Sequence, residues 1–333
     1  MPLSPAGCAS RATPGTRLLR PHSAFRHQLF CYADGDHGFL AGTIELVVDA
    51  LARQAAVLVA VAPARALALR EALGAESGRV RFEDVHELGR NPARMIPTWR
   101  AFIGAHERDE GATVVIGEAV WPGRSAAEID ECERHEALLN VAFDEGQGWH
   151  LLCAYDLDGL PDEVIDAAGR THPLLAVDGV CDGNDRYACG HEPPSPFRGV
   201  LPAARGTVKQ LAFSGSDLAR VRRMVSAWAS AQALAREPTQ ELVLAVDELA
   251  VNSIRHGGGA GTVRCWREDD VLLCEVQDSG WIRDPLVGRV RPSAEATSGR
   301  GVWIANQLCD LVQIRSSPGG SVVRVHKRVA DAV

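Results

Sequence analysis

The sequence predicts an α/β protein with two domains, the first built on a parallel sheet and the second built as a two-layer α/β sandwich. Three observations support this fold class. Short apolar runs alternate with helical patterns in the first half, two helical patterns precede turn-linked strands in the second half, and a stretch rich in Gly and Pro separates the halves. The 333 residues, of which 46% are hydrophobic, suffice for about two domains.

The strands expected in the first domain are short apolar runs, and the helices between them carry apolar residues at helical spacing. For example, Ala56–Ala62 is an apolar run that ends at Pro63, which is typical of a buried strand. Strands that alternate with helices favour a parallel sheet covered on both faces. The predicted strands are His27–Tyr32, Ala56–Ala62, Thr113–Gly117 and Trp149–Tyr155, and the predicted helices are Gly38–Gln54, Ala64–Leu73 and Ala126–Asp144.

The second domain begins with a strand and two helices and ends in a hairpin that turns at Pro318-Gly319-Gly320. Helices on one side of an antiparallel or mixed sheet give a two-layer sandwich. The predicted strands are Val208–Phe213, Thr262–Arg267, Val271–Gln277, Leu311–Ser316 and Ser321–Lys327, and the predicted helices are Asp217–Ala233, Thr239–Arg255 and Val302–Asp310.

Composition sets the domain boundaries. Residues 1–20 are rich in Pro, Ser, Ala and Arg without a continuous apolar core, which is typical of a disordered tail rather than a targeting peptide. The run Pro193-Pro194-Ser195-Pro196 lies in a segment that breaks the strand–helix pattern, so we expect a linker at 188–207. The first domain is then assigned to residues 21–187 and the second to residues 208–330.

Charge and cysteine content exclude several classes of function. The net charge is −8, only two lysines are present and no basic run occurs, so the chain is a poor nucleic-acid binder. No apolar run approaches the roughly 20 residues of a membrane span. The nine cysteines are scattered, and several lie inside apolar runs, where a free thiol behaves as a small hydrophobe. We therefore expect a cytoplasmic protein.

Three short motifs in the second domain point to chemistry, and the first lies on the predicted helix Thr239–Arg255. Glu248 and Asn252 are four positions apart, so they share a helix face, opposite the apolar one. A carboxylate beside a carboxamide supplies oxygen ligands for hydrated Mg²⁺, and the carboxylate can accept a proton from an attacking hydroxyl. Taken alone, the pair equally suits a solvated polar helix face.

The second and third motifs follow strands or turns. Asp278 ends an apolar strand and Gly280 follows, an arrangement in which the carboxylate can accept from the amine of adenine while the glycine backbone approaches the ring. Gly299, Arg300 and Gly301 form a turn that leads into a helix, where unpaired N–H groups favour phosphate and Arg300 adds charge. The loop from Trp281 to Thr297 suits a lid. Each motif alone also occurs in ordinary turns.

Together, in this order over roughly 120 residues, the motifs resemble the GHKL (Bergerat) ATP-binding fold. The segment Asp247-Glu248-Leu249-Ala250-Val251-Asn252-Ser253-Ile254-Arg255-His256-Gly257 is similar to that of anti-sigma serine kinases of the HATPase_c_2 type. The resemblance implies ATP and Mg²⁺ as cofactors. It makes Glu248 the catalytic base, Asn252 the magnesium ligand, Asp278 and Gly280 the adenine contacts and Gly299, Arg300 and Gly301 the phosphate contacts. His256 and Ser321 join the nucleotide-binding set on the same resemblance.

The sequence departs from this family where many members carry a second glycine after the first. Ile282 stands there, next to the bulky Trp281, which affects the lid-side contacts more than Asp278. The resemblance implies an anti-sigma factor that sequesters a sigma factor and phosphorylates Ser or Thr of an anti-anti-sigma protein of the STAS type. It leaves open a homodimer, a non-catalytic ATP-binding interaction module and a sensor histidine kinase, although the residues before Val208 are a Pro-rich linker rather than a phosphoacceptor helix.

The first domain lacks a Walker A loop, which argues against P-loop hydrolysis. Its sequence resembles the MEDS sensory domain, a RecA-like module of regulators in methanogens and methylotrophs. The stretches that carry the resemblance are 27–32, 115–121, 136–140, 151–156 and 172–173. It implies a sensory domain for a small molecule, and the polar residues expected to line its pocket are His27, Glu118, Glu136, Tyr155 and His172. The same residues also suit ordinary core hydrogen bonds.

One further set of residues has the chemistry of a zinc site. His172, Cys181, Cys189 and His191 lie close in the sequence, but their spacing is irregular and no Cys-x-x-Cys pair occurs. A zinc site made of these four residues is therefore not expected.

Overall fold

The computed structural model describes residues 25–107, 113–143, 148–177, 180–187, 197–293 and 299–329. The tail predicted at residues 1–20 lies outside them. The chain divides into two compact units, Met1–Pro194 and Ser195–Val333.

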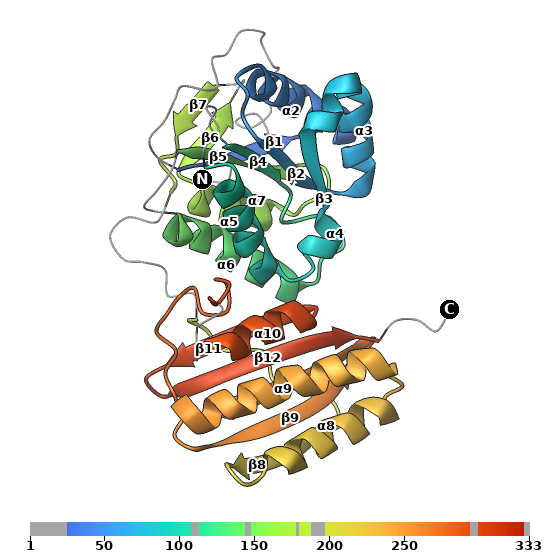
Figure 1. Ribbon diagram of the computed structural model, residues 1–333, viewed down its shortest axis with the longest axis vertical. Helices are drawn as coiled ribbons and strands as arrows, with labels where there is room; N and C mark the ends of the chain where they lie inside the picture. The colour runs from blue at the N-terminus through green and yellow to red at the C-terminus, as the bar shows by residue number, and fades with distance from the viewer. Residues whose placement is uncertain are drawn as a thin grey trace. The chain divides into compact units, whose positions relative to one another are not determined.

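The first unit is a seven-stranded sheet in the order β3-β2-β4-β5-β1-β6-β7 (Figure 1). Six strands run parallel, and β7 pairs antiparallel with β6. The strands are β1 (Arg26–Tyr32), β2 (Val57–Val61), β3 (Val80–Asp84), β4 (Thr113–Gly117), β5 (Trp149–Asp156), β6 (Leu174–Val177) and β7 (Val180–Gly183). The α-helices are α2 (Gly35–Ala52), α3 (Pro63–Leu73), α4 (Val85–Leu88), α5 (Met95–Ala105), α6 (Ala126–Ala142) and α7 (Asp162–Thr171), with 3₁₀ turns η1 (Gly74–Arg79) and η2 (Pro92–Arg94).

Alternate residues of the central strands face opposite layers of helices. Val57, Val59 and Val61 pack with Phe39 and Leu46 of α2 in one hydrophobic cluster. The intervening side chains face the other layer of helices, as where Trp99 of α5 lies close to Gly117. Strands β2, β4 and β5 are buried along their whole length, which explains why they read as continuous apolar runs.

The parallel α/β architecture predicted for this half is confirmed, and the structure adds elements that the sequence pattern did not reveal. Strand β3 has the sequence Val-Arg-Phe-Glu-Asp, of which only Val80 is buried, so its apolar signal is weak. The short strands β6 and β7 and helices α5 and α7 were also not predicted.

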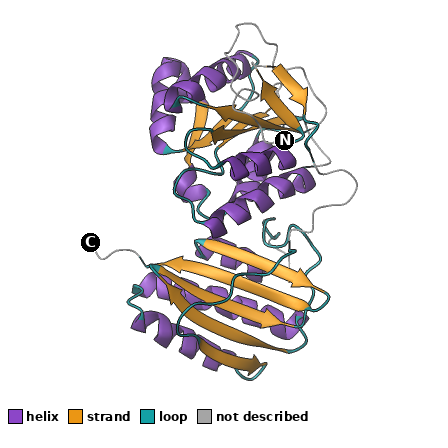
Figure 2. Cartoon of the chain, turned by 180° about the vertical axis from the view of Figure 1, so that it is seen from behind, coloured by secondary structure: helices purple, strands orange, loops and turns teal. Residues whose placement is uncertain are grey.

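The second unit is a five-stranded antiparallel sheet in the order β11-β12-β10-β9-β8, with its helices on one face (Figure 2). This confirms the predicted two-layer sandwich. The strands are β8 (Lys209–Ser214), β9 (Ala260–Glu268), β10 (Val271–Asp278), β11 (Leu311–Ser317) and β12 (Gly320–Arg328), and the helices are α8 (Leu218–Ala231), α9 (Arg236–His256) and α10 (Arg300–Leu308).

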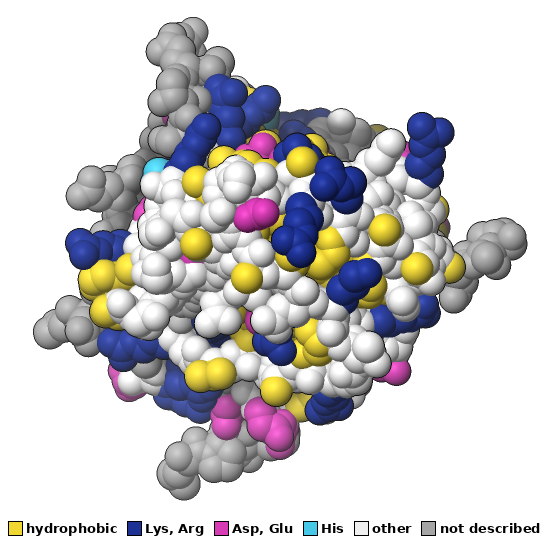
Figure 3. All heavy atoms as spheres, turned by 90° about the horizontal axis from the view of Figure 1, so that it is seen from below, with side chains coloured by type: hydrophobic (Ala, Val, Ile, Leu, Met, Phe, Trp, Pro, Cys, Tyr) yellow, Lys and Arg dark blue, Asp and Glu magenta, His cyan; other side chains and the backbone are white. Residues whose placement is uncertain are grey.

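The apolar face of α9 forms the centre of this second core. Leu242, Val246 and Leu249 are buried there against strand residues such as Val263 and Val276. Within the described ranges, no helix is both long and apolar enough to cross a membrane. Figure 3 shows one face of the molecule, on which Lys and Arg side chains are scattered among neutral and apolar ones.

Two leucines on α9 test this packing. Leu242 is 0% exposed and Leu244 is 45% exposed. Leu242→Ala should lower the free energy of unfolding by about 2–5 kcal/mol, because it removes buried methyl groups and leaves a cavity. Leu244→Ala should change it by less than about 0.5 kcal/mol. Urea denaturation with hydrogen exchange of the α9 amides measures both in the full chain, and equal effects of the two substitutions would contradict this packing.

Candidate functional site

Helix α9 and the start of α10 bring the first and third motifs together. Glu248 and Asn252 are half-buried on α9, so the face that they share adjoins the buried side of the helix rather than lying opposite it as expected. A Cβ atom placed on Gly301 would lie 2.5 Å from Nδ2 of Asn252, so the first turn of α10 contacts the Asn252 carboxamide directly. The neighbouring Asp247 points elsewhere, because its carboxylate pairs with Arg222 of α8 at 3.0 Å.

The second motif lies against the end of the same helix. Asp278 accepts hydrogen bonds from Ser253 Oγ at 2.5 Å and from the Gly280 backbone N–H at 2.8 Å. A Cβ atom on Gly280 would lie 2.8 Å from the His256 carbonyl oxygen, which is closer than real Cβ contacts. The end of β10 therefore meets the end of α9 at a distance that only glycine allows at position 280.

A chain of hydroxyl groups holds the turn after Asp278. Ile282 N–H donates to Ser316 Oγ at 2.8 Å, the Ser316 and Ser321 hydroxyls are 2.7 Å apart, and Ser321 donates to the Gly280 carbonyl at 2.8 Å. Ser321 lies opposite Asp278 in the β10–β12 register and is buried. Its hydroxyl proton is thus directed at the backbone of the turn.

The predicted phosphate turn opens α10. Gly299 has φ 82°, in the left-handed region that favours glycine, and the helix begins at the exposed Arg300. Residues 294–297 of the predicted lid lie outside the described residues. The rest, residues 281–293, forms neither helix nor strand and is attached to α10 where Asn306 donates to the Gly288 carbonyl at 2.9 Å.

These residues fit an adenine nucleotide with Mg²⁺. The carboxylate of Asp278 keeps further acceptor capacity at the end of β10, where Gly280 packs too closely against the end of α9 for a side chain. Asn252 and Glu248 supply oxygen atoms on the adjoining helix face, next to the N-terminus of α10. His256 is exposed at the end of α9, and its carbonyl rather than its ring is what approaches Gly280.

In the first unit, four of the five residues expected to line a sensory pocket lie together. Glu136 Oε2 of α6 is 3.0 Å from His27 Nε2 of β1 and 3.4 Å from His172 Nε2, which follows α7. The Tyr155 ring stands edge-on to His172, with ring centroids 5.8 Å apart. A cavity of about 130 Å³ is lined by Glu136 and Tyr155 among others.

Glu118 belongs to a different cluster, at the carboxyl ends of the strands. It pairs with Arg65, which also binds Asp156 at 2.9 Å, and it accepts from the Tyr32 hydroxyl at 3.4 Å. Burial raises the pKa of Glu118, and the Arg65 charge opposes that rise. The structure thus separates Glu118 from the other four candidates.

The sequence did not identify Cys153 and Asn140 as members of the first cluster. Cys153 Sγ lies 3.4 Å from His27 Nε2 and 3.5 Å from Glu136 Oε2, and Asn140 Oδ1 lies 3.0 Å from His27 Nδ1. Burial, together with His172 beside it, lowers the pKa of His27 from 6.5 to about 4. Burial, with the Glu136 carboxylate beside it, raises the pKa of the Cys153 thiol.

Cys189 and His191 of the disfavoured zinc set lie outside the described residues, as does the side chain of Cys181. His172, the remaining member of that set, belongs instead to the cluster around Glu136.

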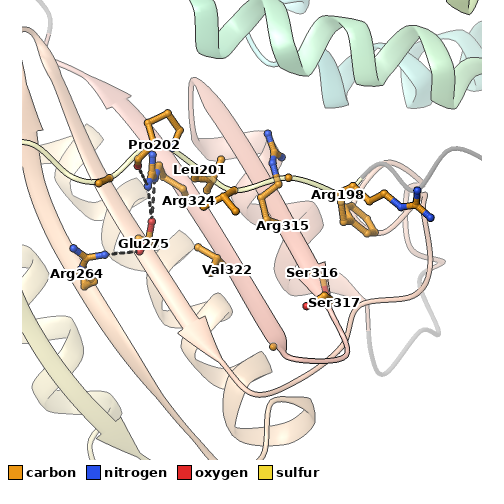
Figure 4. Close-up of a pocket in the computed structure, with 15 residues that line it drawn as sticks. Arg198, Leu201, Pro202, Arg264, Glu275, Arg315, Ser316, Ser317, Val322 and Arg324 are labelled. Carbon is orange, nitrogen blue, oxygen red and sulfur yellow. Dashed lines mark hydrogen bonds and ion pairs between the residues drawn. The ribbon is translucent and has the colours of Figure 1, made fainter.

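The face of the second sheet that lies away from the helices holds a separate cavity of about 430 Å³ (Figure 4). Buried Glu275 accepts from Arg324 at 2.7 Å and from Arg264 at 3.1 Å, and segment 197–203 covers these side chains, with Arg324 also donating to the Pro202 carbonyl. Glu248, Asn252 and Asp278 do not line it. This cavity is therefore distinct from the predicted nucleotide site.

Comparison with known proteins identifies both halves. Residues 26–173 match the family model of the MEDS domain, described as the methanogen/methylotroph, DcmR sensory domain. Residues 212–327 match the model of the histidine kinase-like ATPase domain. The chain therefore joins a MEDS domain to a histidine kinase-like ATPase domain, as the sequence motifs indicated.

Similarity to individual proteins is low. No curated protein matches the chain. The crystal structure of the RsbU and RsbW domains of Rv1364c from Mycobacterium tuberculosis is similar at 17% identity and a TM-score of 0.28, over 36% of this chain and 32% of that one. The chain thus spans about a third of the length of that structure.

Two glycines test the close packing between the end of β10 and the end of α9. Gly280→Ala should destabilise the second unit by about 1–3 kcal/mol, because the new methyl group meets backbone atoms that have to move. In Gly319→Ala the methyl group would meet only Ser317 Oγ at 3.5 Å, an ordinary contact, so this substitution serves as the control in the same domain. Thermal unfolding of both full-length variants measures the difference, and an unchanged Gly280→Ala variant would rule out the close approach.

Proposed function

We propose that this chain, which joins a MEDS domain to a histidine kinase-like ATPase domain, binds Mg-ATP and acts as an anti-sigma factor with serine/threonine kinase activity. In this proposal the second domain sequesters a sigma factor and phosphorylates Ser or Thr of an anti-anti-sigma protein, while the first domain senses a ligand. The observation that carries it is the convergence of Asn252, Asp278 and Gly301 around the end of α9.

Adenine recognition rests on Asp278. Ser253 and the Gly280 N–H fix the orientation of its carboxylate, and each carboxylate oxygen keeps a lone pair for an exocyclic amine. In this proposal the Gly280 backbone lies beside the flat ring, and its close packing against the His256 carbonyl holds the turn in place. A pre-oriented acceptor loses little side-chain entropy on binding, which favours affinity.

Phosphate binding and transfer rest on α9 and α10. The N–H groups at the start of α10 would hold phosphate oxygens, and the Asn252 amide oxygen would hold the Mg²⁺ that neutralises their charge. Glu248, one helical turn before Asn252, would orient the attacking hydroxyl and accept its proton. Positioning and charge neutralisation would supply most of the catalysis.

Asp278→Asn tests nucleotide binding. The substitution removes the charge from the acceptor, and a hydrogen bond to a charged group contributes about 1.5–3 kcal/mol, so ATP affinity should fall by about 10- to 150-fold. Isothermal titration with Mg-ATP measures it. Asp270→Asn, in the exposed turn at the other end of β10, is the matched control and should bind like the unmodified chain. If the unmodified chain itself shows no ATP affinity, this function is wrong.

Glu248→Gln separates binding from transfer. The variant should bind Mg-ATP normally and transfer phosphate to a cognate antagonist about 10²- to 10⁴-fold more slowly, because the general base is lost. Asp247→Asn is the control, since this residue pairs with Arg222 on the side of α8. The measurement is transfer of labelled phosphate from ATP, and full activity of Glu248→Gln would remove Glu248 from the base role.

Two other functions give different outcomes in the same assay. ATP binding without transfer to any candidate antagonist, even by the unmodified chain, would favour an interaction module in which ATP shapes a docking surface. Acid-labile phosphate on the chain itself would favour a sensor histidine kinase. Capture of partners from the source cell identifies the sigma factor and its antagonist.

A further inference from the structure

Four side chains with metal-binding atoms meet inside the first unit. His27, Glu136, Cys153 and His172, which we call the buried quartet, come from β1, α6, β5 and the residue after α7. One ligand atom from each lies within 4.8 Å of all the others, and no member is more than 3% exposed. We propose that the buried quartet binds a divalent transition metal ion, and that Zn²⁺ is the best match to its ligands.

The distances around Glu136 are close to those of a tetrahedral site. Glu136 Oε2 lies 3.0 Å from His27 Nε2, 3.4 Å from His172 Nε2 and 3.5 Å from Cys153 Sγ. Ligand atoms about 2.0–2.3 Å from a tetrahedral zinc ion lie about 3.3–3.8 Å from one another. The distances to Glu136 Oε2 are in or close to this range, and all four ligand atoms lie within 4.8 Å of one another, so a central ion requires the most distant of them to approach by up to about 1 Å.

Outer hydrogen bonds orient both imidazole rings toward the centre. His172 Nδ1 lies 2.8 Å from the Ala168 carbonyl, an acceptor, so Nδ1 carries the proton. Asn140 Nδ2 donates to the Thr171 carbonyl at 2.8 Å, which leaves Asn140 Oδ1 to accept from His27 Nδ1 at 3.0 Å. Each neutral ring then presents the Nε2 lone pair inward, an arrangement in which a second shell holds histidine ligands.

Without a metal ion, the inward-facing atoms of the quartet are paired only if one ring carries a second proton toward Glu136 or the Cys153 thiol donates to it. With Nδ1 protonated on both rings, two nitrogen lone pairs, a carboxylate and a sulfur atom face one another in a buried space. His172 Nε2 and Glu136 Oε1 make no hydrogen bond within the part of the chain that the structure describes. Moving the protons to Nε2 would turn unprotonated Nδ1 atoms toward the carbonyl oxygens of Ala168 and Asn140. A metal ion satisfies all four groups at once.

The ligand types select the class of metal. Two imidazoles, one carboxylate and one thiol suit a borderline or soft divalent ion, whereas Mg²⁺ and Ca²⁺ prefer oxygen ligands alone. The cavity of about 130 Å³ reaches Glu136 and is also lined by the exposed residues Glu133 and Glu163, so it offers an entry path. The proposal concerns the sensory half of the chain and does not depend on ATP binding by the other half.

The test is zinc binding by the full-length chain after treatment with a chelator. Elemental analysis after dialysis against Zn²⁺ should give one ion per chain, and competition with a chromogenic chelator measures its affinity. Cys153→Ser should lower that affinity by at least about 10-fold, since a thiolate ligand is lost. Cys132→Ser is the matched control, because Cys132 is equally buried in the same unit but donates to the Ala119 carbonyl.

Cobalt supplies a readout that a purely structural role would not change. Co²⁺ bound to the unmodified chain and to Cys132→Ser should give the visible spectrum of a tetrahedral site with a sulfur ligand, and Cys153→Ser should lose the sulfur-to-cobalt band. His172→Ala should lose the tetrahedral spectrum altogether, while circular dichroism reports whether each variant is folded. The proposal is overturned if the chain takes up no Zn²⁺, or if uptake and spectra are the same in Cys153→Ser as in Cys132→Ser.

Discussion

The contact between the end of α9 and the end of β10 is the interaction on which the ATPase half of the chain depends. Ser279 donates through its backbone N–H at 3.2 Å and its hydroxyl at 2.9 Å to the Gly257 carbonyl, while Asp278 accepts from Ser253. These bonds hold a strand end against a helix end. They place the Asp278 acceptor on the helix that carries Asn252, so two motifs 26 positions apart share one site.

The sequence predicted these motifs because each of them is local. Helical spacing alone puts Glu248 and Asn252 on one face, and a glycine turn before an apolar helix predicts the start of α10. The supporting side chains were not predictable in the same way. Ser253 and Ser316 are ordinary serines in the sequence, and only the tertiary fold directs their hydroxyls to Asp278 and to the turn after it.

In the first domain the fold class was predictable, but the grouping of its polar residues was not. Its strand–helix alternation predicted the parallel sheet, but edge strands such as β3 carry too few apolar residues to be recognised. The polar residues of the quartet were named because they lie in the stretches that resemble the MEDS domain, whereas Cys153 suited the core equally well as a small hydrophobe. The quartet comes from four separate elements, so no regular spacing in the sequence predicts it. For the same reason the sequence grouped Glu118 with these residues, although the structure pairs it with Arg65 instead.

Segment 197–203 joins the outer face of the second sheet to the turn after β10. The Ser316 N–H donates to the Phe197 carbonyl at 3.1 Å, and the Ser316 hydroxyl lies between Ile282 and Ser321, which in turn holds the Gly280 carbonyl. The segment is therefore bonded to the strand that supports the predicted adenine contact. An unbroken chain of contacts is needed for a change at segment 197–203 to reach the turn at Gly280. Coupling between the two also requires an element with two states that both of them bias. The segment and the turn both contact the hairpin of β11 and β12, through Ser316 and Ser321.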